Sequence, residues 1–427
     1  MSSFIITGKC PIEGRLSISG NKNAALACLY ATLLTDSKVV LRNIPEIEDV
    51  KVTLKILSSI GRKVTKLGKG CYQFEGNNLV NDVPKDLAGL VRGSILLAGA
   101  FVARKSDLRL PPPGGDVIGL RRLDAHFSAL MQLGAKCTVD DENYLGFHAD
   151  KLLGNFIFLE EASVTATENA IMASSLADGI TTIYNAACEP HIQDLCHMLG
   201  EMGCTISGIG SNLLSVNGCS SLTGCEFEIG PDYMEAGSFI GLAGAAGGEV
   251  QLDCVNPSQI RIFSGGFEKL GIHCREIGPD SILIPRRQSR VIRRSVDGRT
   301  IKIDDAPWPG FPTDILSIIT VAATQMKGMV LIHEKMFESR MFFVDYLIRM
   351  GANIIQCDPH RVLVAGPTDL VASRLISPDV RAGMALVVAA ICANGESEIQ
   401  NAYQIERGYE NLEQKLSAIG VKIRRNE

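Results

Sequence analysis

The chain has 427 residues, more than one hydrophobic core usually supports, so we expect two domains of about 200 residues each. Hydrophobic residues make up 46% of the sequence and charged residues 21%, which excludes a disordered chain and indicates a globular α/β protein. The net charge of -5 argues against a general nucleic-acid binder, and no apolar run reaches the roughly 18 residues that a membrane span requires.

Six predicted helices end on a glycine that follows an apolar residue and precedes a short strand-like run. Glycine most easily adopts the left-handed conformation that closes the end of a helix, so each of these glycines is predicted to stop a helix. Their regular spacing of 68 to 80 residues predicts six copies of one supersecondary unit. In chain order they are Gly61, Gly134, Gly203, Gly271, Gly351 and Gly420.

Each glycine-ended helix follows a strand with a turn, and before that strand lies a second helix that is apolar on nearly every side. A helix that is apolar all round is normally buried, whereas the glycine-ended helices carry a polar face. We therefore expect a helix-strand-helix-strand unit, with three copies in each domain and six buried helices inside. The expected buried helices cover residues 23–34, 93–103, 169–177, 237–246, 315–323 and 383–393.

Polar residues gather where loops enter these helices, and there backbone N–H groups and the helix dipole favour anions by about 0.3 to 1 kcal/mol. Ser, Thr or Gly would cap the helices adequately, so repeated charges indicate loops that bind one polyanionic ligand. Taken alone, each residue also fits a solvated cap or a surface ion pair. The set comprises Lys22, Asn23, Asp49, Arg92, Asp116, Arg121, Arg122, Ser163, Thr165, Glu189, Asp232, Glu235, Asp314, Glu338, Arg340, Asp379, Arg381 and Arg407.

Several segments stand in the order and spacing of a known family: SISGNKNAAL, PGGDVIG, SVTATENAIMA, PGFPTDI, FESRM, PDVRAGMALV and ERGYENLEQKL. From about Gly8 to the C-terminus, the chain resembles the UDP-N-acetylglucosamine 1-carboxyvinyltransferase family of enolpyruvyl transferases. The resemblance implies two inside-out α/β barrel domains with three repeats each. It also implies that residues 1–21 join residues 231–427 in the second domain, that residues 22–230 form the catalytic-loop domain, and that the active site lies in the cleft between them.

The activity that this resemblance implies is transfer of the enolpyruvyl group of phosphoenolpyruvate to the 3-hydroxyl of UDP-N-acetylglucosamine, with release of phosphate. This is the first committed step of peptidoglycan precursor synthesis. The implied enzyme is a cytoplasmic monomer or weak homo-oligomer without a metal or other cofactor, and without nucleic-acid or membrane partners. Two alternatives stay open: a transferase for another nucleotide acceptor such as UMP, and a catalytically silent paralogue that binds a UDP-sugar.

The resemblance also implies roles for individual residues. The catalytic residues would be Lys22, Asp116, Asp314 and Arg407. Phosphoenolpyruvate would be bound by Lys22, Asn23, Arg92, Arg121, Arg340, Asp379, Arg381 and Arg407, and arginine forks suit its carboxylate and phosphate. The UDP-sugar would be bound by Asn23, Arg92, Arg121, Asp124, Ser163, Thr165, Asp314 and Glu338.

Asp116 occupies a loop position where many members of the family carry cysteine. As a general acid it would protonate C3 of the enolpyruvyl group, but keeping an aspartic acid protonated near pH 7 costs about 4 kcal/mol. The alternative is that Asp116 only caps the following turn. A carboxylate is a poorer nucleophile than a thiolate, so we expect insensitivity to the epoxide antibiotic fosfomycin. Further departures from the family are Glu48, Arg122, Glu161 and Tyr233.

Overall fold

The computed structural model describes residues 2–76, 79–116 and 118–426, which fold into two compact units. Unit 1 contains residues 2–19, 118–120 and 231–426, and unit 2 contains the described residues of 20–116 and 121–230. Residues 118–120 group with unit 1 because the carbonyl of Ile118 accepts a hydrogen bond from the backbone N–H of Ser339 at 3.2 Å. In the described parts of the chain, every helix is too short or too polar to cross a bilayer.

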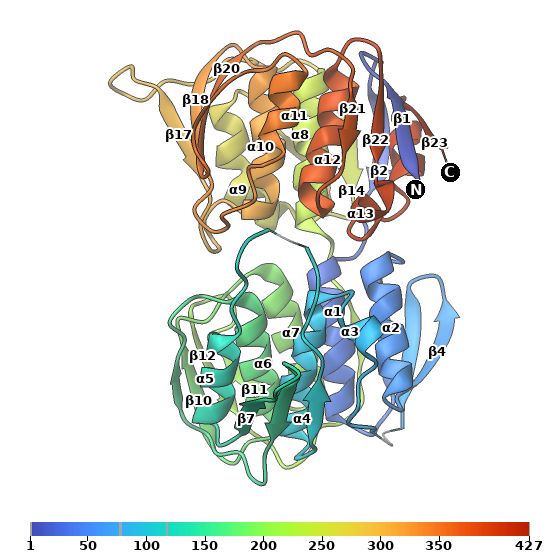
Figure 1. The fold of residues 1–427 in the computed structure, drawn as a ribbon, viewed down its shortest axis with the longest axis vertical. Helices are drawn as coiled ribbons and strands as arrows, with labels where there is room; N and C mark the ends of the chain where they lie inside the picture. The colour runs from blue at the N-terminus through green and yellow to red at the C-terminus, as the bar shows by residue number, and fades with distance from the viewer. Residues whose placement is uncertain (1, 77–78, 117, 427) are drawn as a thin grey trace. The chain divides into compact units, whose positions relative to one another are not determined.

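Six buried helices form the centres of the two units, three in each, as the apolar segments predict (Figure 1). Burial within the unit, rather than local helix propensity, stabilises these helices, because an isolated helix that is apolar on all sides is not stable in water. In unit 2 they are α1 (Lys22–Ala31), α4 (Leu97–Ala103), which continues the 3₁₀ helix η2 (Arg92–Leu96), and α6 (Val164–Ser175). In unit 1 they are α8 (Tyr233–Ala246), α10 (Thr313–Thr324) and α12 (Val380–Cys392).

The predicted glycine stops are confirmed at all six positions. The outer helices are α2 (Glu48–Ser59), α5 (Asp124–Gln132), α7 (Pro190–Glu201), α9 (Pro257–Lys269), α11 (Val344–Arg349) and α14 (Leu412–Ala418). Each is followed by its glycine in the left-handed conformation, with φ between 78° and 106°. The residue after each glycine donates a hydrogen bond back to the last turn, as Arg62 does to the carbonyl of Leu57 at 2.9 Å. This is the geometry of a Schellman cap.

Six separate sheets surround the buried helices, and most repeats hold two more strands than the helix-strand-helix-strand prediction. Unit 2 has three of these sheets. The first has the strand order β13–β3–β5–β4 (Glu226–Glu228, Val39–Arg42, Cys71–Glu75, Lys63–Gly68), and the second has the order β6–β8–β7 (Leu108–Leu110, Leu145–His148, Lys136–Val139). The third has the order β11–β12–β10–β9 (Thr205–Ser207, Leu213–Asn217, Ile180–Tyr184, Phe156–Phe158). Unit 1 has the other three sheets. The first has the strand order β15–β16–β14–β2 (Arg275–Gly278, Ser281–Ile284, Glu249–Asp253, Glu13–Ser17), and the second has the order β17–β18–β20–β19 (Ile301–Asp304, Gly328–His333, Arg361–Gly366, Asn353–Asp358). The third has the order β21–β22–β1–β23 (Arg374–Ile376, Glu396–Gln400, Ser3–Thr7, Lys422–Asn426).

Three strands complete sheets that are distant in sequence. β2 pairs in parallel with β14, and β13 pairs in parallel with β3. β1 lies between β22 and β23, antiparallel to both, so that Ser3 is paired with Asn426. Both β1 and β2 therefore belong to unit 1, although α1, which follows them, belongs to unit 2.

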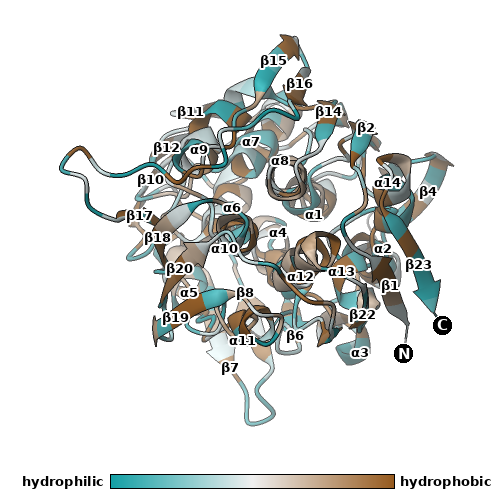
Figure 2. Ribbon diagram, turned by 90° about the horizontal axis from the view of Figure 1, so that it is seen from above, coloured by the Kyte–Doolittle hydropathy of each residue, from teal (hydrophilic) through white to brown (hydrophobic). Residues whose placement is uncertain are grey.

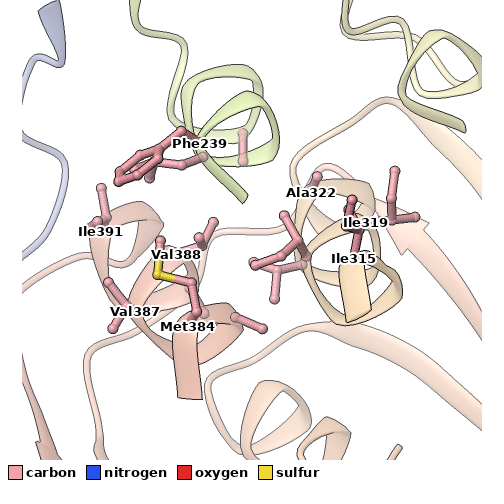
Figure 3. Close-up of a cluster of buried hydrophobic side chains, with 14 of the residues drawn as sticks. Phe239, Ile315, Ile319, Ala322, Met384, Val387, Val388 and Ile391 are labelled. Carbon is pink, nitrogen blue, oxygen red and sulfur yellow. The ribbon is translucent and has the colours of Figure 1, made fainter. Parts of the chain in front are cut away.

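The core of unit 1 lies between α8, α10 and α12. Figure 3 shows Phe239 of α8, Ile315 of α10, and Met384 and Val388 of α12 in the cluster of buried side chains at these helices, and all four are fully buried. Figure 2 shows these three helices inside the ring of unit 1 strands. The first turns of α10 and α12 carry the charged residues described next, so the packed core fixes where those residues lie.

Candidate functional site

In unit 1, Asp314 lies between two buried arginines in the first turn of α10. Its Oδ1 accepts from Nη2 of Arg340 at 2.7 Å, and its Oδ2 accepts from Nε of Arg381 at 2.8 Å. The two arginine side chains are 5% and 6% exposed and that of Asp314 is 20% exposed, so water screens these pairs only weakly.

The two arginines remain charged despite their burial. Burial lowers the pKa of Arg340, but the negative charges, first of Asp314 and then of Asp379, outweigh it and leave this pKa raised. The pKa of Arg381 is likewise raised, because Asp314 outweighs the effect of burial. The guanidinium of Arg381 also lies 5.4 Å from the ring centroid of Tyr409, within cation–π distance.

Two other predicted residues of unit 1 have structural contacts nearby. Asp379 is the N-cap of α12, where its Oδ1 accepts from the backbone N–H groups of Arg381 and Ala382 at 2.8 and 3.0 Å. A local pattern, Asp before an apolar helix, predicts that capping role. Arg407 is buried, and its Nη1 donates to Oε1 of Gln404 at 3.0 Å.

Glu338 is exposed and lies beside Gly119, the last residue of the PGGDVIG segment. Gly119 has a φ of 138°, and a Cβ added there would overlap the Glu338 carboxylate. This close approach explains why residue 119 is a glycine. Within unit 1, it brings the loop next to the segment that carries Arg340.

In unit 2, Lys22 begins α1, and its Nζ lies 2.6 Å from Oδ2 of Asp49. Asn21 caps the helix by accepting from the backbone N–H of Ala24 at 2.9 Å, which leaves the side chain of Lys22 available for this pair. Asn23 follows on α1 and is half-buried. Sequence reasoning gave Asp49 no role beyond a polar helix entry, because its pairing with Lys22 joins two different helices.

Arg92 and Arg121 place two cations close together. Nη2 of Arg92 donates to the main-chain carbonyl of Arg121 at 2.6 Å. Burial, and then the charge of Arg121, lower the pKa of Arg92 to about 10. Two adjacent guanidinium groups form a local field that favours a polyanion such as a diphosphate.

The Asp116 loop packs closely onto the chain segment before η2. A Cβ at Gly114 would overlap the carbonyl oxygen of Gly89, and one at Gly115 would lie 2.9 Å from Cβ of Arg92. Gly115 also has a φ of 107°, which few other residues adopt. The paired glycines therefore hold the main chain before Asp116 against Arg92. Asp116 itself is half-buried.

His126 of α5 links the arginine pair to the start of α6. Its Nδ1 lies 2.8 Å from Nδ2 of Asn169, so the amide donates and the hydrogen resides on Nε2, which lies 3.1 Å from Oγ1 of Thr165. Burial, and then the charges of Arg92 and Arg121, lower the pKa of His126 to about 3. The ring is neutral, and the contact was missed because His126 occupies an apolar helix face without any motif around it.

The remaining predicted residues of unit 2 are Ser163 and Asp124. Ser163 is the half-buried N-cap residue of α6 and Asp124 is the exposed first residue of α5. Thus the predicted residues divide between the two units, and we call the two sets the unit 1 cluster and the unit 2 cluster. The unit 1 cluster is Asp314, Glu338, Arg340, Asp379, Arg381 and Arg407, and the unit 2 cluster is Lys22, Asn23, Arg92, Asp116, Arg121, Asp124, Ser163 and Thr165.

The departures from the family pattern lie mostly outside these contacts. Tyr233 is 2% exposed and packs against Trp308, with ring centroids 5.3 Å apart, so it belongs to the core of unit 1. Glu48 pairs with Lys51 on the surface of α2 at 2.5 Å, and Glu161 is exposed. Within the described ranges, no three His, Cys, Asp or Glu side chains form a metal-binding group.

Solved structures of low sequence identity share this fold. The enolpyruvyl transferase NikO from Streptomyces tendae matches with a TM-score of 0.88 and 19% identity, covering 100% of this chain and 99% of that one. The EPSP synthase of Acinetobacter baumannii matches with a TM-score of 0.76 and 17% identity, covering 100% of both chains. The predicted enolpyruvyl transferase fold is therefore confirmed.

Sequence relatives are much nearer. A protein from Treponema denticola named UDP-N-acetylglucosamine 1-carboxyvinyltransferase is 54% identical over 100% of both chains. Proteins of the same name from Borreliella burgdorferi and Porphyromonas gingivalis are 51% and 46% identical, and they cover 100% of this chain with 99% and 100% of their own lengths. The family model described as EPSP synthase (3-phosphoshikimate 1-carboxyvinyltransferase) matches residues 6–416. On this evidence the chain belongs to the EPSP synthase family of enolpyruvyl transferases and, within it, to the UDP-N-acetylglucosamine 1-carboxyvinyltransferases.

Proposed function

We propose that this chain transfers the enolpyruvyl group of phosphoenolpyruvate to the 3-hydroxyl of UDP-N-acetylglucosamine and releases phosphate. The observation that carries the proposal is the full-length identity of 46% to 54% with relatives of that name. The two charged clusters support it. The unit 1 cluster offers a carboxylate with two arginines, and the unit 2 cluster offers a pair of arginines suited to a diphosphate.

In the proposed mechanism, Asp314 accepts the proton of the sugar hydroxyl as its oxygen attacks C2 of phosphoenolpyruvate. The ion pairs to Arg340 and Arg381 fix both oxygens of Asp314, and a general base needs such a fixed position. Once Asp314 is protonated, the two arginines lose part of their counter-charge. They can then stabilise the negative charge of the phosphate and carboxylate on the tetrahedral addition product.

Asp116 serves as the general acid that protonates C3 in the addition step. Phosphate then leaves from the tetrahedral phosphate ketal, and the double bond re-forms as a proton is lost from C3. Lys22 and Arg407 bind the phosphoenolpyruvate portion, and Arg92, Arg121, Ser163 and Thr165 bind the diphosphate and nucleotide. We further propose that both clusters act on the same pair of substrates, in a cytoplasmic monomer or weak homo-oligomer.

The test is release of phosphate from phosphoenolpyruvate by the purified protein, measured with UDP-N-acetylglucosamine, UMP and shikimate 3-phosphate as separate acceptors. We expect turnover only with UDP-N-acetylglucosamine. Turnover with UMP or shikimate 3-phosphate instead would show that the proposed acceptor is wrong. Binding of the UDP-sugar without any turnover would identify a silent paralogue.

Fosfomycin tests the chemistry of the loop. Residues 111–122 contain Asp116 and no cysteine. We expect no time-dependent inactivation and no covalent adduct, because opening the epoxide requires a stronger nucleophile than a carboxylate. A mass adduct on the peptide that contains Asp116 would contradict this expectation.

A further inference from the structure

Two buried carboxyl groups lie together beneath the loop that carries Arg340. Strands β17 and β18 run in parallel, with Asp304 paired to His333 at their ends. The next residues along each strand are Asp305 and Glu334, and both are 0% exposed. Their side chains therefore leave the same end of the same strand pair in a place that water does not reach.

Three of the four carboxylate oxygens have clear hydrogen-bond donors. Oδ1 of Asp305 accepts from the backbone N–H of Lys335 at 2.6 Å. Oε1 of Glu334 accepts from the backbone N–H groups of Met336 and Phe337 at 2.9 and 3.0 Å. Oε2 of Glu334 accepts from the hydroxyl of Thr313 at 2.9 Å.

The fourth oxygen, Oδ2 of Asp305, is buried and has no hydrogen-bond donor among the residues that the structure describes. An unsatisfied buried acceptor is costly, and two adjacent buried negative charges are costlier still. One proton on Glu334 removes both costs, because it neutralises one carboxyl group and supplies a donor for Oδ2 of Asp305. Consistent with this, burial and then the Asp305 carboxyl group raise the pKa of Glu334 to about 8.

Other charged groups also lie near Glu334. Arg340 attracts the ionised form of Glu334, but less strongly than burial and Asp305 oppose it. The ammonium of Lys335 lies 2.8 Å from Asp304. The ring of His360 lies 2.9 Å from the main-chain carbonyl of Glu334 rather than from its carboxyl group. On α10, Asp314 faces Arg340.

The groups that this carboxyl pair holds lead directly to the ion pair of the candidate site. Thr313, bonded to Glu334, immediately precedes Asp314. The backbone of residues 335–337, bonded to both carboxyl groups, leads to Arg340. The carboxyl pair thus contacts both chain segments that must be aligned for the 2.7 Å contact between Arg340 and Asp314.

We propose that Asp305 and Glu334 share one proton, and that this protonated pair positions Asp314 and Arg340 for the enolpyruvyl transfer; the proposal rests on the function proposed above. Neither residue touches the reacting atoms. When the proton is lost to solvent, two adjacent negative charges remain, and their repulsion displaces Thr313 and residues 335–337. The alignment of Asp314, and with it turnover, is then lost.

The pH dependence of kcat tests the proposal. In the wild-type protein, kcat should fall about tenfold per pH unit above the ionisation of Glu334, near pH 8. In Glu334→Gln the amide donates to Asp305 without titrating, so this alkaline decline should disappear while kcat at pH 7 stays within about threefold. Asp305→Asn supplies a donor to an ionised Glu334 and should abolish the decline as well.

Two further variants separate positioning from simple structural damage. Glu334→Ala should lower kcat at pH 7 at least about tenfold with a smaller change in KM, so that Glu334→Gln acts as the rescue. Asp304→Asn alters the neighbouring carboxylate, which pairs with Lys302 and Lys335 at the surface, and should keep the wild-type pH profile. An unchanged alkaline decline in both Glu334→Gln and Asp305→Asn would overturn the proposal.

An infrared measurement makes the test independent of turnover. At pH 7 the wild-type protein should show a carboxylic-acid C=O band that disappears when the pH is raised to 9.5, and Glu334→Gln should lack this pH-dependent band. If the band behaves this way but no acceptor supports phosphate release, the proposed function fails and the proton-sharing pair stands. If turnover is normal and the variant shows the same band change as the wild-type protein, the pair fails and the function stands.

Discussion

The charged clusters of the two units differ in how they compensate the charges of their arginines. In unit 1, Arg340 and Arg381 share the carboxylate of Asp314, and both have raised pKa values. In unit 2, Arg92 bonds to a main-chain carbonyl beside a second guanidinium, and its pKa is lowered. The first cluster carries its own counter-charge, whereas the second gains most from an incoming anion. The variants below test this difference, from the largest expected effect to the smallest.

Asp314→Ala should have the largest effect, because it removes the counter-charge of both buried arginines. Leaving a buried charge without its partner costs about 3 to 5 kcal/mol, so the melting temperature should fall clearly. Loss of the proposed general base should lower kcat by about 10² to 10⁴. Phosphate-release kinetics and thermal melting measure the two effects. If stability falls and kcat does not, Asp314 is only a structural counter-charge.

Asp116→Asn should lower kcat by about 10² to 10⁴ as well, but with little change in melting temperature, because the side chain is half-buried. This variant therefore tests the loss of a catalytic group alone, whereas Asp314→Ala also removes the counter-charge of two arginines. Steady-state kinetics together with thermal melting give the answer. Full turnover by the variant would support the alternative that Asp116 only caps a turn.

Arg92→Met should weaken substrate binding about 10- to 100-fold, the usual range for a lost hydrogen bond to a charged group, while the substrate-free protein melts at the same temperature or higher. Its matched control is Arg381→Met, which should lower the melting temperature because Asp314 then loses a buried arginine partner. Equal destabilisation by both substitutions would remove the distinction between the clusters.

His126→Gln should have the smallest effect, which appears only in acid. The pKa of His126 is about 3 in the folded chain and 6.5 ordinarily, so below pH 6.5 the unfolded chain binds more protons. The wild-type free energy of unfolding should thus fall as the pH drops, with this residue contributing about 2 kcal/mol at pH 5. Urea denaturation at pH 7 and pH 5 measures the loss, which the variant should lack.

Features set by local sequence could be predicted. The six left-handed glycines follow from helix termination, and the buried helices follow from their uniformly apolar faces. Short strands such as β9 and β13 were missed because three residues carry no alternation pattern that stands out from a loop. The pairing of β2 with β14, and of β13 with β3, joins segments more than 180 residues apart in the sequence. The periodicity of the sequence does not encode such long-range pairing.

The features of the candidate site also divide into those that the local sequence predicts and those that depend on packing. The residues at helix entries could be identified because their types and repeated positions are visible in the sequence. Their partners could not, since Lys22 meets Asp49, and His126 meets Thr165, only after different helices pack together. The pairing of Asp305 with Glu334 similarly arises from two neighbouring strand ends. Motifs identify which residues can do chemistry, but packing decides what each of them faces.

The position of β1 and β2 has a consequence for synthesis of the chain. Both strands are made before residues 20–230, yet in the described part of the chain β1 pairs with residues 396–400 and 422–426, and β2 with residues 249–253. Residues 20–230 contain all of unit 2, which can fold as soon as they have emerged, while unit 1 waits for β23. Because Ser3 and Asn426 are paired, a short linker could join β23 to β1, and a chain opened between residues 19 and 20 would let both units be made without interruption.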